Sequence, residues 1–393
     1  MLVSHSQLGL LALLLVPATA FATPGDVWVV DSGGTADFVD LPAAVSAASD
    51  GDSILVLPGN YSGFAIDGKS LSITGDLVPF VQVEGTVRVR NLAAGMDVHL
   101  ASLALQSGIR ANDCDGHLGF SDCLLEPEGL NTDPHAPISG SHRVVSCADV
   151  VFSRCALNGG DGGIYYSCQD LADAAPGEAA LYVDDSRVAL YSCELQGGAG
   201  GDANDGACGW STICLVGSAG AGGAGLLATN QSFVYADDSI LAGGAGGQFD
   251  TECGSGESQP AGAPVELNSS QLQVAQDPVL KLASPTVVRS DELLSVSVTG
   301  PPGATALLLW SAMPDWRPFG GAIGLLNVDG QSLNLLALGT IPASGQLEAT
   351  VTPPPVPIGE DARHLYVQAF ALESTVGRML GTSSGLVVLD PAF

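Results

Sequence analysis

The sequence predicts an all-β protein, a parallel β-solenoid followed by a small β-sandwich. Three observations lead there: a glycine-rich composition, an internal repeat built of short strands, and a change of pattern near residue 285. The 393 residues include 51 glycines without a collagen period, which indicates many turns and close backbone approaches. A hydrophobic content of 46% with only 14% charged residues excludes an intrinsically disordered chain.

Residues 1–22 are predicted to be a secretory signal peptide. An apolar run extends from Leu8 to Val16, Pro17 ends it, and Ala20-Phe21-Ala22 forms a small-x-small cleavage site. The run is too short to span a bilayer. We therefore expect a secreted protein, extracellular or on the cell surface. Its mature chain begins near Thr23 and has no transmembrane segment.

The charge balance excludes one class of partner. The chain has 42 acidic and 12 basic residues, for a formal net charge of -30. Such a surface repels nucleic acid, because binding to nucleic acid requires cationic side chains at the phosphates. It also attracts divalent cations.

An internal repeat organises the middle of the chain. The segments "LGFSDCLLEPEG", "VVFSRCALNGGDGG", "ALYSCELQGGAGG" and "VYADDSILAGGAGG" align at Cys123, Cys155, Cys193 and Ser239, at intervals of 32, 38 and 46 residues. A constant strand core with a loop of varying length is typical of a parallel β-solenoid, in which each coil stacks on the last and buries a continuous core.

The start of the solenoid is also visible. In "DFVDLPAAVSAASDGDSILVLPGNYSGFAIDGKSLSITGD", Asp40 is a candidate N-cap and Pro42 lies in the first turn of a predicted helix over 41–48. This helix would cover the open first coil. The apolar runs after it are expected to form the faces of the coils, with glycines at the corners.

This opening segment resembles that of secreted bacterial right-handed parallel β-helix proteins, the pectate-lyase-like superfold; pectinesterases share the pattern. The resemblance implies a right-handed β-helix over residues 23–280, including the N-terminal capping helix. Lyases of this superfold use Ca²⁺ to acidify a uronate and an Arg or Lys to abstract its proton. Many unrelated functions use the same scaffold, so the resemblance indicates the fold more than the activity.

Residues 285–393 show alternating strands at turn-marked intervals, which predicts a β-sandwich. The pattern is similar to C-terminal accessory domains of secreted environmental bacterial proteins. We expect a separate domain with no site attached.

The nine cysteines fall into two sets. Three of them precede a core leucine by two residues, so they share its inward face and are expected to be buried free thiols: Cys123, Cys155 and Cys193. The other six are disulfide candidates in an exported protein: Cys114, Cys147, Cys168, Cys208, Cys214 and Cys253.

The loops inserted after the "GGxGG" segments carry acidic residues. Hard oxygen donors on loops that should stack suit Ca²⁺, and the candidate ligands are Asp202, Asn204, Asp205, Asp250 and Glu252. The alternative is a set of polar turns without metal. With Asp161, these residues are predicted to form one acidic, cross-linked surface at which a ligand or Ca²⁺ binds.

Arg154 and Asp122 are the candidates for catalytic residues, with Arg154 as the base. It neighbours inward Cys155, so it should point outward, in line with Asp122 and Asp238. This row is either a metal-and-base surface or an ordinary ion pair between coils.

Three functions remain open at this stage. The first is a non-catalytic protein of the cell surface or matrix that contacts polysaccharide. The second is a Ca²⁺-dependent polysaccharide lyase or related carbohydrate-active enzyme, and the third is a structural spacer.

Overall fold

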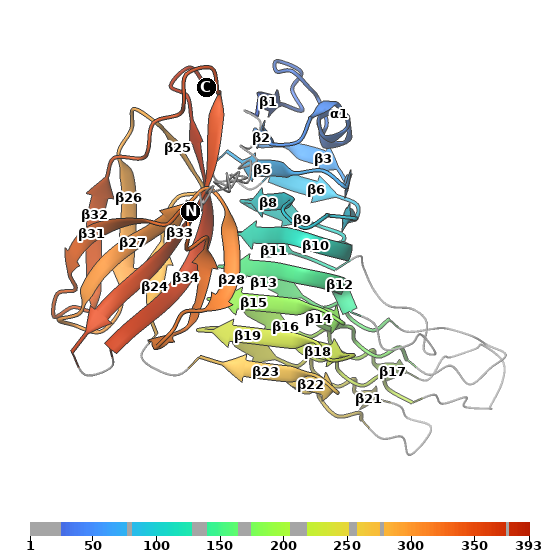
Figure 1. Cartoon of the computed structure of the whole chain (residues 1–393). Coiled ribbons are helices and arrows are strands. Elements are labelled where there is room, and N and C mark those ends of the chain that lie inside the picture. Colours follow the sequence, from blue (N-terminus) through green and yellow to red (C-terminus); the bar gives the residue numbers. More distant parts are fainter. Residues whose placement is uncertain are drawn as a thin grey trace, which may run out of the picture.

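The computed structural model describes residues 25–76, 81–127, 140–163, 174–204, 218–250, 258–275, 279–374 and 377–393. The predicted signal peptide lies outside these residues. The chain forms a parallel β-helix and a β-sandwich that lies along one side of it (Figure 1).

The β-helix has three faces, each a ladder of parallel strands. The first face contains β1 (Val27–Val30), β2 (Asp52–Val56), β5 (Leu71–Gly75), β8 (Asp97–Ala101), β15 (Arg187–Tyr191), β19 (Phe233–Asp237) and β23 (Gln271–Val274). The second contains β3 (Asn60–Ser62), β6 (Val81–Glu84), β9 (Leu103–Leu105), β11 (Leu124–Leu125), β13 (Ala156–Asn158), β16 (Glu194–Gln196) and β20 (Ile240–Ala242). The third contains β4 (Ala65–Asp67), β7 (Val87–Arg90), β14 (Ala179–Asp184), β18 (Leu226–Thr229) and β22 (Val265–Asn268). Two long strands, β10 (Ile109–Ser121) and β12 (Gly140–Ser153), run through the third face and on into the first.

The predicted capping helix is confirmed as α1 (Leu41–Ala47), with Asp40 as its N-cap. Leu41, Ala44 and Val45 are buried against the first coils. Lys69 donates to the carbonyls of Val45 and Ala48, which have no partner within the helix, at 3.0 and 2.6 Å. A charged donor therefore closes the end of the cap.

The corners of the middle coils differ from the prediction. Glycine with positive φ does form early corners, as at Gly51 and Gly85. At the later corners, non-glycine residues adopt the left-handed backbone conformation instead, among them Asp122 (φ 53°) and Arg154 (φ 54°). The glycines of the "GGxGG" segments lie elsewhere, in the arm described below.

The C-terminal region is a sandwich of two main sheets around a shared core. The smaller sheet contains β24 (Lys281–Ala283), β26 (Leu294–Thr299) and β32 (Gln346–Val351). The larger contains β25 (Val287–Arg289), β27 (Thr305–Ser311), β29 (Ala322–Ile323), β31 (Asn334–Thr340), β33 (Ala362–Glu373) and β34 (Gly377–Leu389). A further pair is β28 (Pro314–Pro318) with β30 (Leu325–Val328).

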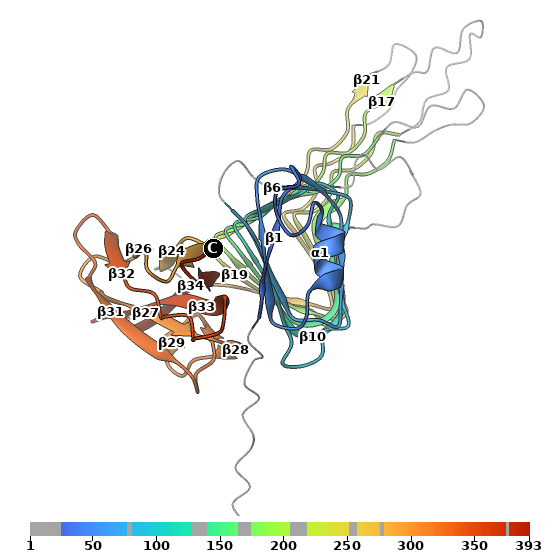
Figure 2. The same ribbon diagram turned by 90° about the horizontal axis from the view of Figure 1, so that it is seen from above.

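The sandwich has a core of its own, and it packs along the first face of the β-helix (Figures 1 and 2). Tyr191 and Tyr235 of the β-helix are fully buried beside Trp316 and Leu325 of the sandwich. A second apolar contact joins Val27 and Leu55 to Ala362, Val387 and Leu389. Because these contacts are apolar and buried, they favour a docked arrangement over two freely moving domains.

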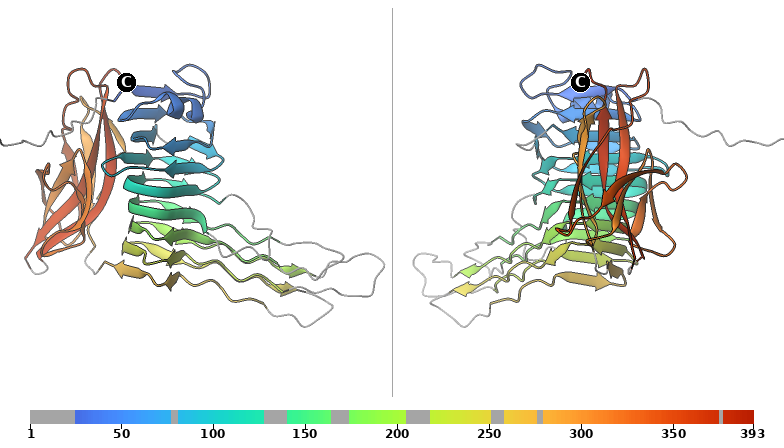
Figure 3. Two further views of the ribbon diagram at one scale, coloured as in Figure 1. Left: turned by 45° about the vertical axis from the view of Figure 1, so that its right-hand side comes forward. Right: turned by 90° about the vertical axis from the view of Figure 1, so that its left-hand side faces the viewer.

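The last three coils also extend an arm away from the body, on the side away from the sandwich (Figures 2 and 3). We define the arm by its outgoing segments 159–163, 197–204 and 243–250 and its returning segments 174–180, 218–225 and 258–264. Two short strands, β17 (Ala203–Asn204) and β21 (Phe249–Asp250), pair within it.

Candidate functional site: a glycine-rich arm and an interdomain groove

The arm is held together by backbone hydrogen bonds that repeat every three residues. Gly197 donates to Ala242 at the end of β20, and Gly200 donates to Ala245 in the next outgoing segment, at 2.9 and 2.8 Å. Gly198 and Gly201 donate instead to a returning segment, at 2.9 and 3.0 Å. A β-strand would repeat every two residues, whereas a three-residue period is that of a polyproline II helix. The arm is therefore a two-layer bundle of extended threefold segments.

This packing explains the "GGxGG" pattern. A Cβ at Gly198 would lie 2.0 Å from the carbonyl oxygen of Gly160, and one at Gly244 would lie 1.8 Å from that of Gly198. These glycines do not have positive φ, so they are needed for close backbone approach rather than for a special conformation. The middle position of each motif points outward, and there the sequence has Asp161, Ala199 or Ala245.

The outer side of the outgoing segments forms an open groove of about 640 Å³. Two exposed carboxylates line it in fixed positions. Asp161 accepts a hydrogen bond from the backbone N–H of Ala199 at 2.7 Å, and Asp202 accepts one from Gln248 at 2.7 Å. Each carboxylate thus uses one oxygen to join neighbouring coils, while its second oxygen has no hydrogen-bond partner among the described residues.

The predicted Ca²⁺ ligands are only partly described. Asn204 and Asp250 are register partners in β17 and β21, and Asp202 lies just before them. Asp205 and Glu252 lie outside the described residues. Within the described ranges, no three His, Cys, Asp or Glu side chains come together as a metal site. Calcium binding by this arm therefore stays a prediction.

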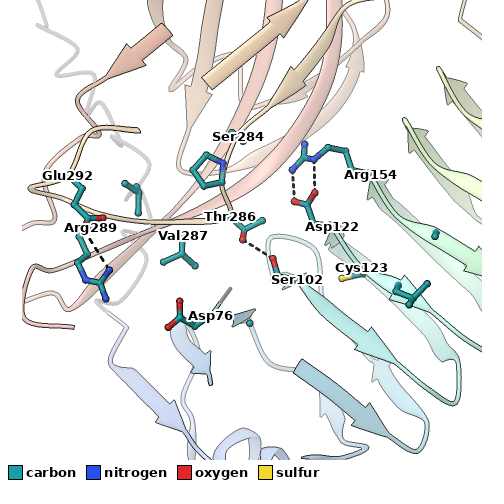
Figure 4. Close-up of a pocket in the computed structure, with 15 residues that line it drawn as sticks. Asp76, Ser102, Asp122, Cys123, Arg154, Ser284, Thr286, Val287, Arg289 and Glu292 are labelled. Atoms are coloured by element: carbon teal, nitrogen blue, oxygen red, sulfur yellow. Dashed lines mark hydrogen bonds and ion pairs between the residues drawn. The ribbon is translucent and has the colours of Figure 1, made fainter. Parts of the chain in front are cut away.

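A second concave surface lies between the β-helix and the sandwich. This interdomain groove has a volume of about 670 Å³, and Figure 4 shows the side chains around it. The β-helix contributes Asp76, Ser102, Asp122 and Arg154, and the sandwich contributes the segment from Ser284 to Arg289, with Glu292. Ser102 and Thr286 hydrogen-bond across it at 3.0 Å.

Arg154, the candidate base, lies here in a paired state. Its guanidinium binds both oxygens of Asp122, at 2.7 and 2.6 Å, and reaches the carbonyl of Leu282 and the hydroxyl of Ser384 in the sandwich. Asp238, the third member of the predicted row, is paired with Lys281 instead, at 2.5 Å. The sequence allowed two arrangements of this row, and the structure shows the ion pairs between neighbouring side chains. The same contacts link the sandwich to the β-helix.

The same interface encloses a cluster of titratable groups that sequence reasoning missed. His117 pairs with Asp149 at 2.8 Å, while Asp97 accepts hydrogen bonds from His364 and Tyr366 of the sandwich. Burial lowers the pKa of His99 well below its ordinary value, and the electrostatic interaction with neighbouring His364 adds to this shift. Burial would also lower the pKa of His117, but the Asp149 carboxylate outweighs it and raises the pKa.

A signal for this covered face was present in the sequence. Outward positions of the first face carry Val151, Ala189, Tyr191 and Tyr235 where a solvated strand would carry charge. Apolar side chains on both faces of a strand indicate a sheet covered on both sides. What covers the sheet could not be deduced from this pattern.

The inward cysteines Cys123, Cys155 and Cys193 are buried free thiols, as expected. Cys114 and Cys147, two of the six disulfide candidates, are instead free and buried. They are register partners in β10 and β12, and both point into the core, where each thiol donates to a carbonyl of its own strand. The remaining disulfide candidates lie outside the described residues: Cys168, Cys208, Cys214 and Cys253.

Comparisons with known proteins do not assign the chain to a family. No protein-family model matches it, and no curated protein matches it. Among solved structures, a superoxide reductase (neelaredoxin) from Ignicoccus hospitalis shares 15% identity over 28% of this chain and 80% of its own, with a TM-score of 0.17. The enzymatically active domain of tailspike protein 2 from bacteriophage CBA120 shares 10% identity over 90% of this chain and 67% of its own, also with a TM-score of 0.17. Likenesses at this level carry no argument about function.

In the described part of the chain, no helix has the length and apolar character needed to cross a membrane.

Proposed function

We propose that the protein is exported and acts at the cell surface or in the matrix as a non-catalytic polysaccharide-binding protein, with the arm as its contact surface. One observation carries the proposal: the arm holds two exposed carboxylates, Asp161 and Asp202, in fixed positions along an open groove. Sugar hydroxyls donate hydrogen bonds to such oxygens, and an open groove admits a chain rather than a small molecule.

The charge of the groove restricts the class of glycan that is expected to bind. The groove is lined by two aspartates with glycine, alanine and Gln248, and among the described residues no basic side chain lines it. A uronate polymer would be repelled by these carboxylates and by the net charge of -30. The expected ligand is therefore a neutral or amino-sugar polysaccharide.

The rigidity of the arm supports the same role. Its segments are cross-linked by backbone hydrogen bonds in two directions, so the groove is ordered before a ligand arrives. A pre-organised surface loses less conformational entropy when it binds.

The test is a glycan array with the mature protein, followed by calorimetry on the glycans that bind. Asp161→Ala/Asp202→Ala should weaken binding about a hundredfold or more, because each aspartate contributes a charged acceptor worth roughly 1.5–3 kcal/mol. Asp291→Ala on the sandwich, at an exposed position, is the matched control and should bind like the wild type.

Two outcomes contradict the proposal. One is that the double variant keeps its full affinity. The other is that the wild type, with or without Ca²⁺, releases unsaturated uronate products from a polymer, which would make it a lyase.

A further inference from the structure

The last coil of the β-helix leaves its core uncovered. Ala228 and Ala236, in the coil before it, are 0% and 2% exposed. Their register partners in the last coil are Leu267 and Val274, which are 42% and 62% exposed although they occupy the same core-facing rows. Large apolar side chains at inward positions are exposed here because, among the described residues, no further coil covers them.

The opposite end of the β-helix has the cover that the last coil lacks in the described part of the chain. There, α1 covers the first coil, and Val30 beneath it is 0% exposed. In Figure 1, β22 and β23 form the end away from α1, and no described element lies across them. Both strands have a hydrogen-bonded neighbour on one side only in the described sheet. Repeat proteins ordinarily cover such an end, because an open strand edge over an exposed core invites pairing.

This end of an acidic molecule carries few charges. Residues 258–275 contain a single charged side chain, that of Glu266. Elsewhere, a net charge of -30 makes two copies repel one another. The open end is therefore a surface where two copies can approach closely.

We propose that this open end binds the same end of a second copy of the chain, in a closed twofold dimer. Twofold symmetry places like edges against each other in antiparallel orientation, so β22 and β23 of each copy gain the partner strands that they lack. The exposed core rows of the two copies then cover one another.

The other described segments of the chain are poorly placed to cover this end. The described chain begins at the far end of the β-helix, beside β1, and the sandwich occupies a side face. A different protein that supplies a strand is the alternative occupant, and the experiment below separates it from self-association.

The test is sedimentation velocity on the mature protein across a concentration series. The wild type should sediment as a species of twice the mass of one chain, with no larger species as concentration rises. Leu267→Lys/Val274→Lys should sediment as a monomer, because four buried ammonium groups would face one another across the dimer. The two positions are exposed in one copy, so the variant should keep the melting temperature of a dilute wild-type monomer.

The matched control is Leu293→Lys/Leu335→Lys on the sandwich, where the side chains are 65% and 60% exposed. It should remain dimeric. A wild type that is monomeric at every concentration overturns the proposal and leaves the end to a different partner. Open-ended polymers, or a dimer that survives in Leu267→Lys/Val274→Lys, also overturn it.

The dimer would have a consequence for binding that rests on the function proposed above. The arms extend from the last three coils, so pairing these ends brings two arms to the middle of the assembly. Two grooves on one particle raise the avidity for a polymer with repeated sites. Sedimentation requires no glycan, so a failure of the binding proposal would leave the dimer test intact.

Discussion

The imidazole ring of His99 in β8 lies directly against the backbone of Gly385 in β34. A Cβ at position 385 would be 2.3 Å from the Cε1 and Nε2 atoms of that ring. This close approach of the two domains depends on a glycine in one and a buried histidine in the other, within the titratable cluster.

Gly385→Ala should loosen the docking of the sandwich. Overpacking of a tight contact costs roughly 1–3 kcal/mol, and the new Cβ would meet the buried His99 ring at 2.3 Å. Limited proteolysis should release the sandwich sooner than in the wild type, while the β-helix stays resistant. Gly320→Ala is the control, because a Cβ there has nothing within 4 Å. Equal proteolysis of both variants would show that the contact does not limit docking.

The stability of the interface should depend on pH in two opposing ways. His99 has a pKa below the ordinary value of 6.5. Its contribution to stability is therefore present above pH 6.5 and is lost as pH falls below that value. His117 has a raised pKa, so its contribution is present below 6.5 and is lost as pH rises through the raised value. Urea unfolding should be measured across this pH range. His99→Asn should reduce the loss of stability on the acid side, and His117→Gln should reduce the loss of stability on the alkaline side. Unchanged profiles in both variants would exclude these groups as the cause.

Asp237 should destabilise the protein at alkaline pH. Burial raises its pKa from 3.8 to about 7, and neighbouring Asp238 adds to the shift. A raised carboxyl pKa means that stability falls as pH rises from 3.8 to about 7 and stays low above it. Asp237→Asn should therefore be more stable than the wild type at pH near 8, by at most about 4 kcal/mol, and similar near pH 4. A variant less stable at both pH values would contradict this assignment.

The arm should unfold locally when its glycines gain a side chain. In Gly198→Ala/Gly244→Ala, each new Cβ would collide with a backbone oxygen at about 2 Å. Hydrogen exchange should rise about tenfold or more in the arm while the coils keep their protection. Ala245→Ser, at an exposed position of the same segment, is the control. Protection that persists in the glycine variant would argue against the close-packed bundle.

Thiol counting should find five free cysteines in the unfolded, unreduced protein, rather than the three expected from the repeat alone. The five are the buried thiols of the core. The four cysteines outside the described residues are an even number and should be bridged, as is usual in exported proteins. In the native state none of the five should react with a thiol reagent. Peptide mapping that finds Cys114 or Cys147 in a disulfide would refute this count.

The sequence by itself determined the β-helix, its capping helix and the inward position of Cys123, Cys155 and Cys193. These features depend on contacts between equivalent residues of adjacent coils, so the repeat contains the register. The alternation of Cys and Leu specifies a face because side chains of a strand alternate. The same rule placed Arg154 outward, where it now contacts the sandwich.

Only the tertiary structure determined which groups the outward side chains of the β-helix contact. The pairing of Asp97 with Tyr366, which are 269 residues apart, has no local signature because it depends on the shapes of two separately built surfaces. The same holds for the glycines of the arm. Their spacing suggested corners, but their role arises where the backbone of Gly244 meets that of Gly198, a contact between coils that exists only after the coils have stacked. Local patterns specify which face a residue takes, whereas close approach between distant segments depends on the packing of the whole molecule.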